Sequence, residues 1–149
     1  MRKRGKRIKH KRDPSMLMKV TAGVKPMEAD QQLDLGLIYR TAFEAMLSGT
    51  ASEDDFEALA VSSNIALVLE EMRDEGFMDE IKAAQDALMQ CRRRGEQLGR
   101  WGLDGKGMQD VATFLAIHDE QLRTANQKSV VTALMQARQR MTLGHTLEY

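Results

Sequence analysis

Apolar residues recur at helical spacing along most of this chain, from Glu28 onward, and this periodicity is the strongest constraint on its fold. No segment combines alternating polarity with the β-branched and aromatic residues that are typical of a strand. A chain of 149 residues has the size of one ordinary domain and can bury a core of its own. The sequence therefore predicts an all-α fold, in which a single-domain bundle of about five helices follows a flexible basic N-terminal arm.

Start and stop signals divide the predicted bundle, residues 28–149, into five helical segments. Ser52 and Ser129 are expected N-caps, and Gly49 is expected to end the first helix in a left-handed conformation. Short links between the helices favour antiparallel neighbours. The predicted helices run from about Glu28 to Ser48, from Ser52 to Gly76, from Met78 to Leu98, from Asp104 or Gly105 to Ala125, and from Ser129 to Thr142.

The second half of the second predicted helix is the expected centre of the bundle. Phe56, Leu59, Ala60, Ser63 and Leu67 form one stripe along it, and Ile65, Val68, Leu69 and Met72 cover the other side of its second half. A helix that is apolar on nearly all sides is a buried one. The inner positions of the later helices are Ile81, Ala84, Leu88, Cys91, Gly95 and Leu98, then Met108, Val111, Leu115, His118 and Leu122, and finally Val130, Val131, Leu134 and Met141.

Charge is divided unequally along the chain. Residues 1–27 form a basic arm and linker, and eight of the chain's 22 Lys and Arg lie in its first 12 residues. The other 14 face 22 Asp and Glu, so the rest of the chain carries a net charge of −8. Like charges at this density repel one another, and we expect the arm to be disordered when free. The arm's cations are Arg2, Lys3, Arg4, Lys6, Arg7, Lys9, Lys11 and Arg12.

Such an arm is suited to nucleic acid, because Lys and Arg neutralise phosphates and release condensed counterions. The arm therefore predicts binding to RNA or DNA, with the choice between them open. Three other readings stay open: an acidic protein partner, a solubilising tail, and a tail that folds back onto the acidic body.

A second basic cluster consists of Arg92, Arg93, Arg94 and Arg100 and is followed by Trp101. At 100° per residue, Arg93 and Arg100 would project from one helix face. A guanidinium beside an exposed indole can grip phosphates or stack on bases, so Arg93, Arg100 and Trp101 join the predicted nucleic-acid-binding residues. Stabilisation of a helix C-terminus explains the arginines equally well, and a tryptophan often fills a core.

The remaining polar residues do not assemble an active site, so the sequence argues against an enzyme and predicts no cofactor. His118 lies on an inner stripe and is expected to be structural, and Cys91 is expected to be a small buried hydrophobe. The carboxylates Glu70, Glu71, Asp74 and Glu75 diverge around one helix, which favours a solvated acidic face or a docking surface for a basic partner over a metal site.

The chain is expected to be cytoplasmic and to lack a membrane partner. No apolar stretch follows the basic start as in a signal peptide, and no segment approaches the roughly 20 apolar residues that a membrane span needs. A single cysteine excludes an intramolecular disulfide and favours a reducing compartment.

The stretches "IKAAQDALMQCRRRGEQLGRWGL" and "FLAIHDEQL" resemble a group of small uncharacterised helical proteins encoded by bacteriophages and prophages. In that group a basic N-terminal segment precedes a helical body with "QDAL", "GR" and "HDxQL" elements. The resemblance covers about Met16 to Met141 and implies a phage accessory protein in a bacterial host cell, but it transfers no catalytic residue. The main hypothesis is a nucleic-acid-binding accessory protein. The alternatives are an inhibitor or adaptor that blocks a host or defence enzyme through its acidic helical surface, and a virion component.

Overall fold

The structure, a computed structural model, describes the backbone of residues 29–142 and the side chains of residues 36–140. These residues form five α-helices and no strand, which confirms the predicted all-α bundle. The predicted arm and linker, residues 1–27, lie outside the described part. The helices are α2 (Ala29–Leu47), α3 (Glu53–Arg73), α4 (Met78–Leu98), α5 (Gly105–Thr124) and α6 (Gln127–Thr142).

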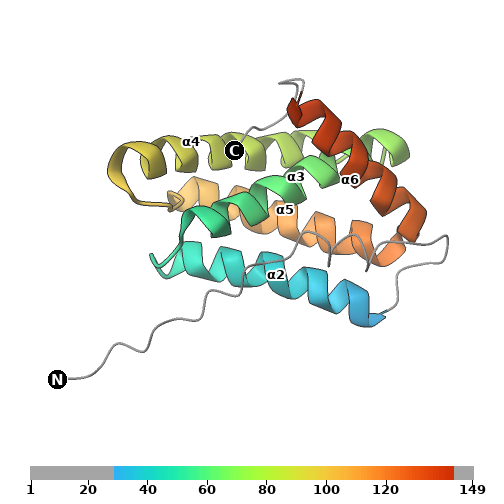
Figure 1. Ribbon diagram of the computed structural model, residues 1–149, viewed down its shortest axis with the longest axis horizontal. Coiled ribbons are helices and arrows are strands. Elements are labelled where there is room, and N and C mark those ends of the chain that lie inside the picture. The colour runs from blue at the N-terminus through green and yellow to red at the C-terminus, as the bar shows by residue number, and fades with distance from the viewer. Residues whose placement is uncertain (1–28, 143–149) are drawn as a thin grey trace.

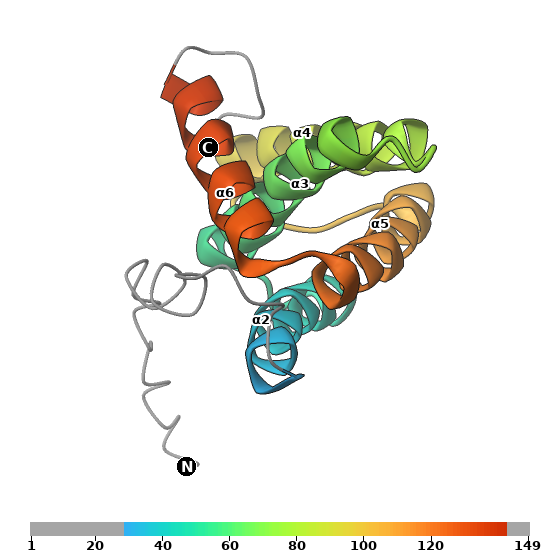
Figure 2. The ribbon, with the colours of Figure 1, turned by 90° about the vertical axis from the view of Figure 1, so that its right-hand side faces the viewer.

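The first four described helices run back and forth, each antiparallel to the next (Figure 1). After α5 the chain turns sharply, and α6 lies across α3 at one end of the bundle (Figure 2). Helix α3 contacts each of the other four helices. Its place at the centre of the bundle confirms the prediction from its nearly continuous apolar surface.

Buried polar side chains on α3 are satisfied within the helix itself. Ser62 and Ser63 are fully buried. Their hydroxyls donate hydrogen bonds to the carbonyl oxygens of Leu59 and Ala60, each over 2.8 Å. Because a buried hydroxyl without a partner costs about 1–3 kcal/mol, these bonds allow small polar residues to lie against neighbouring helices.

Two side-chain amides tie neighbouring helices to α3. The Nε2 of Gln85 on α4 donates to the Oδ1 of the buried Asn64 over 3.1 Å. The Nε2 of Gln121 on α5 donates to the carbonyl oxygen of Ala66 over 3.1 Å. These bonds fix the positions of α4 and α5 along α3, which apolar packing alone specifies less strictly.

The predicted end of α3 at Gly76 is wrong. The helix ends at Arg73, and Asp74 adopts a left-handed conformation with φ 49°. The backbone N–H of Asp74 donates to the carbonyl oxygen of Glu70 over 2.7 Å. Aspartate tolerates this region better than most residues, so it ends the helix before the glycine does.

The predicted start of α6 at Ser129 is also wrong, because the helix begins at Gln127. The Oδ1 of Asn126 accepts a hydrogen bond from the backbone N–H of Ser129 over 2.8 Å. Asn126 is therefore the capping residue, and Ser129 lies in the first turn.

The other predicted boundaries agree with the structure. Gly49 has a φ of 71°, and the carboxylate of Asp104 caps α5 by accepting from the N–H of Gly107 over 2.6 Å. Ser52 precedes α3, and its backbone N–H donates to the carboxylate of Asp55 over 2.9 Å. These caps satisfy backbone groups that the ends of a helix leave without partners.

Among the predicted inner positions whose side chains are described, which leaves out Met141, most are buried or partly buried, with two exceptions. Met72 is 47% exposed and Leu98 is 66% exposed. Each lies in the last turn of its helix. The helical period is right at these positions, but the neighbouring helices do not cover the final turn.

Candidate nucleic-acid interface

Eight of the predicted nucleic-acid-binding residues lie outside the described residues. They are Arg2, Lys3, Arg4, Lys6, Arg7, Lys9, Lys11 and Arg12. Their role in binding stays a prediction. The structure describes the other three: Arg93 on α4, and Arg100 and Trp101 in the link to α5.

Arg93 and Arg100 do not lie on one continuous helix. The backbone turns at Gly99, which has a φ of 67° and donates its N–H to the carbonyl oxygen of Gly95 over 2.9 Å. Arg100 follows this left-handed cap, so the expected projection from one helix face does not hold for it. The two guanidinium groups are instead presented by the end of α4 and by the loop after it.

Two of the four clustered arginines are engaged by the bundle. The Nε of Arg92 lies 2.9 Å from the Oε1 of Glu96, and an Nη of Arg94 donates to the carbonyl oxygen of Gly102 over 2.7 Å. Arg93 and Arg100 are exposed, and neither forms an ion pair with a described residue. These two are the cations of the cluster that remain available to an external anion.

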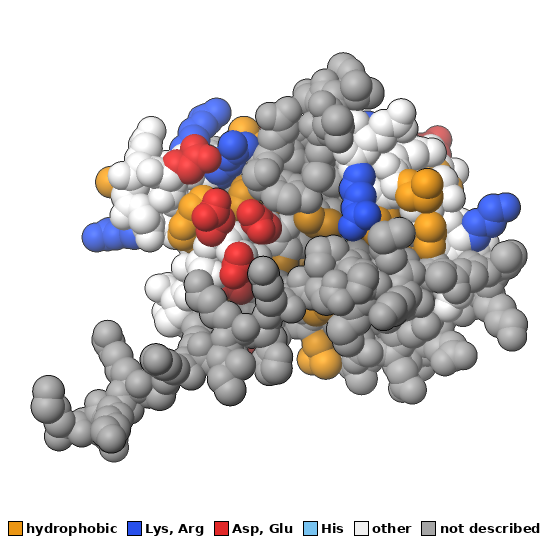
Figure 3. Space-filling model, viewed as in Figure 1, with side chains coloured by type: hydrophobic (Ala, Val, Ile, Leu, Met, Phe, Trp, Pro, Cys, Tyr) orange, Lys and Arg blue, Asp and Glu red, His pale blue; other side chains and the backbone are white. Residues whose placement is uncertain are grey.

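Acidic side chains flank this cluster. Glu53, Asp54 and Glu57 form the first turns of α3, and no described cation pairs with them. Burial raises the pKa of Glu57 above its ordinary value, and the charges of Glu53 and Asp54 raise it further. Figure 3 shows Lys and Arg side chains over the C-terminal half of α4 and Asp and Glu side chains beside them, over the start of α3. The positive surface at this end of α4 is therefore bordered by acidic side chains.

Trp101 packs against the bundle. Its ring lies 5.4 Å from the ring of the buried Phe56, centroid to centroid, at an interplanar angle of 33°. It also covers Gly95 so closely that a Cβ at that position would lie 2.3 Å from the indole. The indole face against α4 is thus closed to a base, and any stacking would use the remaining exposed part of the ring.

His118 is a fully buried core residue, as its inner stripe predicts. Its Nδ1 lies 3.0 Å from the Oε1 of Gln121, and its ring contacts those of Tyr39 and Phe114 at centroid distances of 5.2 and 5.7 Å. Its Nε2 has no hydrogen-bond partner among the described residues. The carboxylate of the following residue, Asp119, pairs with Arg40 and does not orient the imidazole.

Cys91 is also fully buried, and its Sγ lies 3.8 Å from the Sδ of Met46. Burial raises the pKa of the thiol to about 11. The thiolate, which is the nucleophilic form, is therefore scarce at neutral pH, in agreement with the expected packing role. In the described part of the chain, no three His, Cys, Asp or Glu side chains come together so that they could hold a metal ion.

The predicted acidic face at the end of α3 is not uniformly solvated. Glu70 is only 2% exposed, and its Oε1 accepts from the backbone N–H of Phe77 over 2.8 Å. Glu71 pairs with Arg140, and Glu75 pairs with Arg73. Because most of this charge is buried or neutralised, the end of α3 is a poor docking surface.

Sequence reasoning missed a groove between α4 and α5. Two adjoining hollows share Ala83 and Asp110. The acidic residues that line them are Asp79, Glu80, Asp86, Asp104 and Asp110, and the only lining cation is Lys106. The repeated acids on α4 were visible in the sequence, but their alignment with acids some 25 residues later required the packing of α5 on α4.

Comparisons with known proteins do not extend this description, since no protein family, curated protein or solved structure matches the chain. Among the described helices, none combines the length and the apolar character that crossing a membrane requires. The function is therefore argued from the residues.

The contact between Gly95 and Trp101 predicts the sign of a stability change. A helical glycine replaced by alanine usually gains about 0.5–1 kcal/mol. We expect Gly95→Ala instead to lower the free energy of unfolding by about 1–3 kcal/mol, because the added methyl collides with the indole. Urea unfolding followed by circular dichroism measures this difference. Gly36→Ala on α2 is the control: its added Cβ would meet only an Asp119 oxygen at 4.0 Å, so it should be neutral or stabilising.

The buried imidazole predicts a pH dependence of stability. Burial lowers the pKa of His118 below its ordinary value of about 6.5, so the folded state binds fewer protons than the unfolded state in acid. The free energy of unfolding should therefore fall as the pH drops below about 6.5, by up to about 1.4 kcal/mol per pH unit. His118→Gln should flatten this slope. Equal slopes in the native chain and this variant would contradict the assignment to His118.

Proposed function

We propose that this protein is a non-enzymatic accessory protein that binds nucleic acid, RNA or DNA, mainly through phosphate contacts of its basic arm. Arg93 and Arg100 provide a second, smaller contact on the bundle. The resemblance to phage-encoded helical proteins supports this role in the cytoplasm of a bacterial host. The proposal includes no preference for a base sequence, because phosphate contacts carry no sequence information.

The proposal is supported by the ion pairs that the described arginines form or lack. Five of them pair with carboxylates of the bundle: Arg40, Arg73, Arg92, Arg123 and Arg140. Arg93 and Arg100 have no such partner among the described residues. Among the described arginines, Arg93 and Arg100 are therefore the neighbouring pair suited to an external polyanion, while the exposed Lys82, Lys106 and Lys128 are single charges elsewhere on the bundle.

The acidic bundle limits how the complex can form. Its net negative charge repels phosphate at most of its surface, so nucleic acid is expected to approach the arm and the Arg93–Arg100 edge. Each phosphate contact releases condensed counterions, and binding should weaken steeply with salt. If all eight arm cations contact duplex phosphates, log K falls with log salt with a slope of about −7, and partial contact gives about half of that.

A second candidate function is the blocking of a host or defence enzyme through the acidic surface of the bundle. The acid-lined groove between α4 and α5 favours it, because a basic segment of a partner would find several carboxylates there. Pull-down from a bacterial lysate with the full chain, and with Glu80→Gln, Asp86→Asn and Asp110→Asn combined, tests it. A partner that the native chain captures and the triple variant loses would support this candidate.

Neutralising the arm should abolish most of the affinity for nucleic acid. The test variant is a full-length chain in which the eight arm Lys and Arg are replaced by Gln. Fluorescence anisotropy with labelled duplex DNA and single-stranded RNA, across about 50 to 200 mM salt, gives the affinity and its salt slope. We expect steep salt dependence for the native chain and a loss of binding of at least about 100-fold for the variant at low salt.

The edge of the bundle is tested in the same assay. Arg93→Gln with Arg100→Gln should reduce the magnitude of the salt slope by about 1–2. Lys82→Gln with Lys128→Gln removes the same charge from exposed positions elsewhere and should reduce it less. Undetectable binding by the native chain at low salt, or binding that does not change with salt, would exclude the proposed function.

A further inference from the structure

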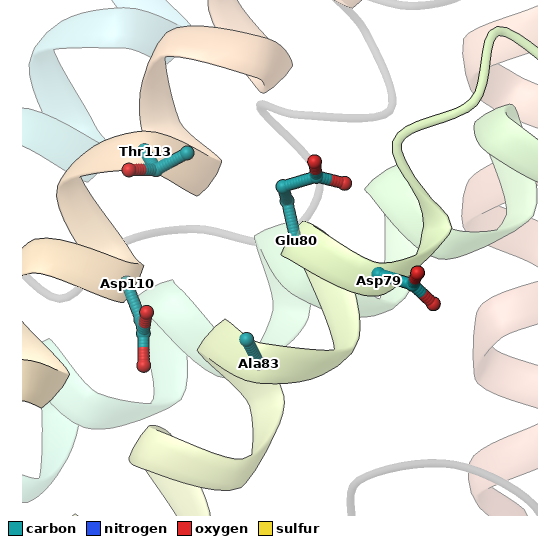
Figure 4. A pocket seen from close by; sticks show the side chains of 5 residues that line it. All are labelled: Asp79, Glu80, Ala83, Asp110 and Thr113. Atoms are coloured by element: carbon teal, nitrogen blue, oxygen red, sulfur yellow. The ribbon is translucent and has the colours of Figure 1, made fainter.

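The groove between α4 and α5 is lined by carboxylates and small residues. Figure 4 shows Glu80 and Ala83 on α4 and Asp110 on the facing helix, α5. Farther along, Ala87 and Gly107 line it, and both are buried. Carboxylates together with small apolar residues suit Lys and Arg, whose heads pair with anions while their aliphatic stems cover apolar surface.

The carboxylates of the groove are not neutralised by the bundle. Asp79, Glu80, Asp86 and Asp110 form no ion pair with a described residue. The nearest lining cation, Lys106, is a single charge. Some exposed acids elsewhere are paired, as Glu71, Glu96 and Glu120 show, whereas Glu53 and Asp54 at the start of α3 are not. The concave surface of the groove therefore carries carboxylates that form no ion pair with a described cation.

The same chain carries the complementary charge. Eight cations lie between Arg2 and Arg12, and 16 residues separate Arg12 from Ala29, where the described chain begins. At about 3.3–3.6 Å per residue, that connection spans up to about 55 Å, while a 21-residue helix such as α4 is only about 32 Å long. A fully extended connection is thus longer than the bundle helices, which allows the arm to reach the groove from the start of α2.

We infer that the basic arm, residues 2–12, docks in the α4–α5 groove of its own chain when nucleic acid is absent. The arm then exchanges one polyanion, the carboxylates of the groove, for another, the phosphates of nucleic acid. This regulation rests on the proposed function, although the docking itself does not. The start of α3 is a less suitable site for the arm, because the helix dipole already stabilises its acids.

Docking would lower the apparent affinity for nucleic acid by the fraction of arms that are free. If about nine-tenths of the arms are docked, the apparent Kd is raised about tenfold. Removing groove carboxylates should therefore strengthen binding to nucleic acid, up to about tenfold. A general reduction of negative charge also strengthens binding, so the control variant must remove the same charge elsewhere.

Contact between arm and groove can be measured in the full chain by paramagnetic relaxation. Cys91 is fully buried with a thiol pKa of about 11, so a nitroxide reagent labels a Gly5→Cys chain at the arm. At low salt we expect broadening of the amide signals of Ala83, Asp86 and Asp110. High salt should remove it, because the pairing is electrostatic.

Two matched triple variants locate the contact. Glu80→Gln, Asp86→Asn and Asp110→Asn should abolish the broadening and tighten binding to duplex DNA by about 3- to 10-fold relative to the control. The control, Glu53→Gln, Asp54→Asn and Glu57→Gln, removes three exposed or half-exposed acids from α3 and should retain the broadening.

The inference would be overturned by no broadening in the groove, by broadening centred on the first turns of α3, or by equal effects of the two triple variants. Nitroxide-labelled Gly5→Cys chains can be mixed with isotope-labelled chains that carry no nitroxide, which distinguishes docking within one chain from contact with a second copy. Broadening of the signals of the isotope-labelled chains in this mixture would also overturn the inference. If no variant binds nucleic acid but the groove signals broaden in the full chain, the proposed function fails and the docking stands.

Discussion

Burial of α3 on all sides is the constraint on which the rest of this bundle depends. A helix can occupy the centre of a small domain only if its surface is apolar or its polar groups are satisfied. The hydroxyls of Ser62 and Ser63 bond to carbonyl groups of α3 itself, and Gln85 and Gln121 reach α3 from α4 and α5. All four outer helices contact α3, and α5 packs in addition against α4 and α2, so the edges and grooves of the bundle follow from both sets of contacts.

The sequence predicted the helices well because their period and caps are local properties. Gly49 was predicted correctly as the end of α2, and the start of α5 was placed at Asp104 or Gly105, since both signals act on residues within one turn. The errors arose where two local signals compete: Asp74 ends α3 before Gly76 does, and Asn126 caps α6 ahead of Ser129. In both places the two candidate residues lie two or three positions apart, and the sequence pattern does not rank them.

The candidate site was less predictable than the fold. The arm was identified from composition alone, because eight cations in 11 positions need no structure to be noticed. The placement of Arg100 beyond a left-handed cap, the indole of Trp101 over Gly95, and the groove of α4 and α5 all depend on contacts between segments. Helical spacing describes one helix at a time, and for that reason it could not show which acidic faces would meet.

The position of Trp101 makes the chain its own optical reporter. It is the one tryptophan of the sequence, and it lies between Gly95 and Phe56, next to Arg100. Emission excited selectively in the indole therefore comes from a single place, where α3, α4 and the link to α5 meet. A change in the wavelength or the quenching of this emission would report local unfolding around Trp101, or the binding of a molecule beside it. No attached dye would be needed.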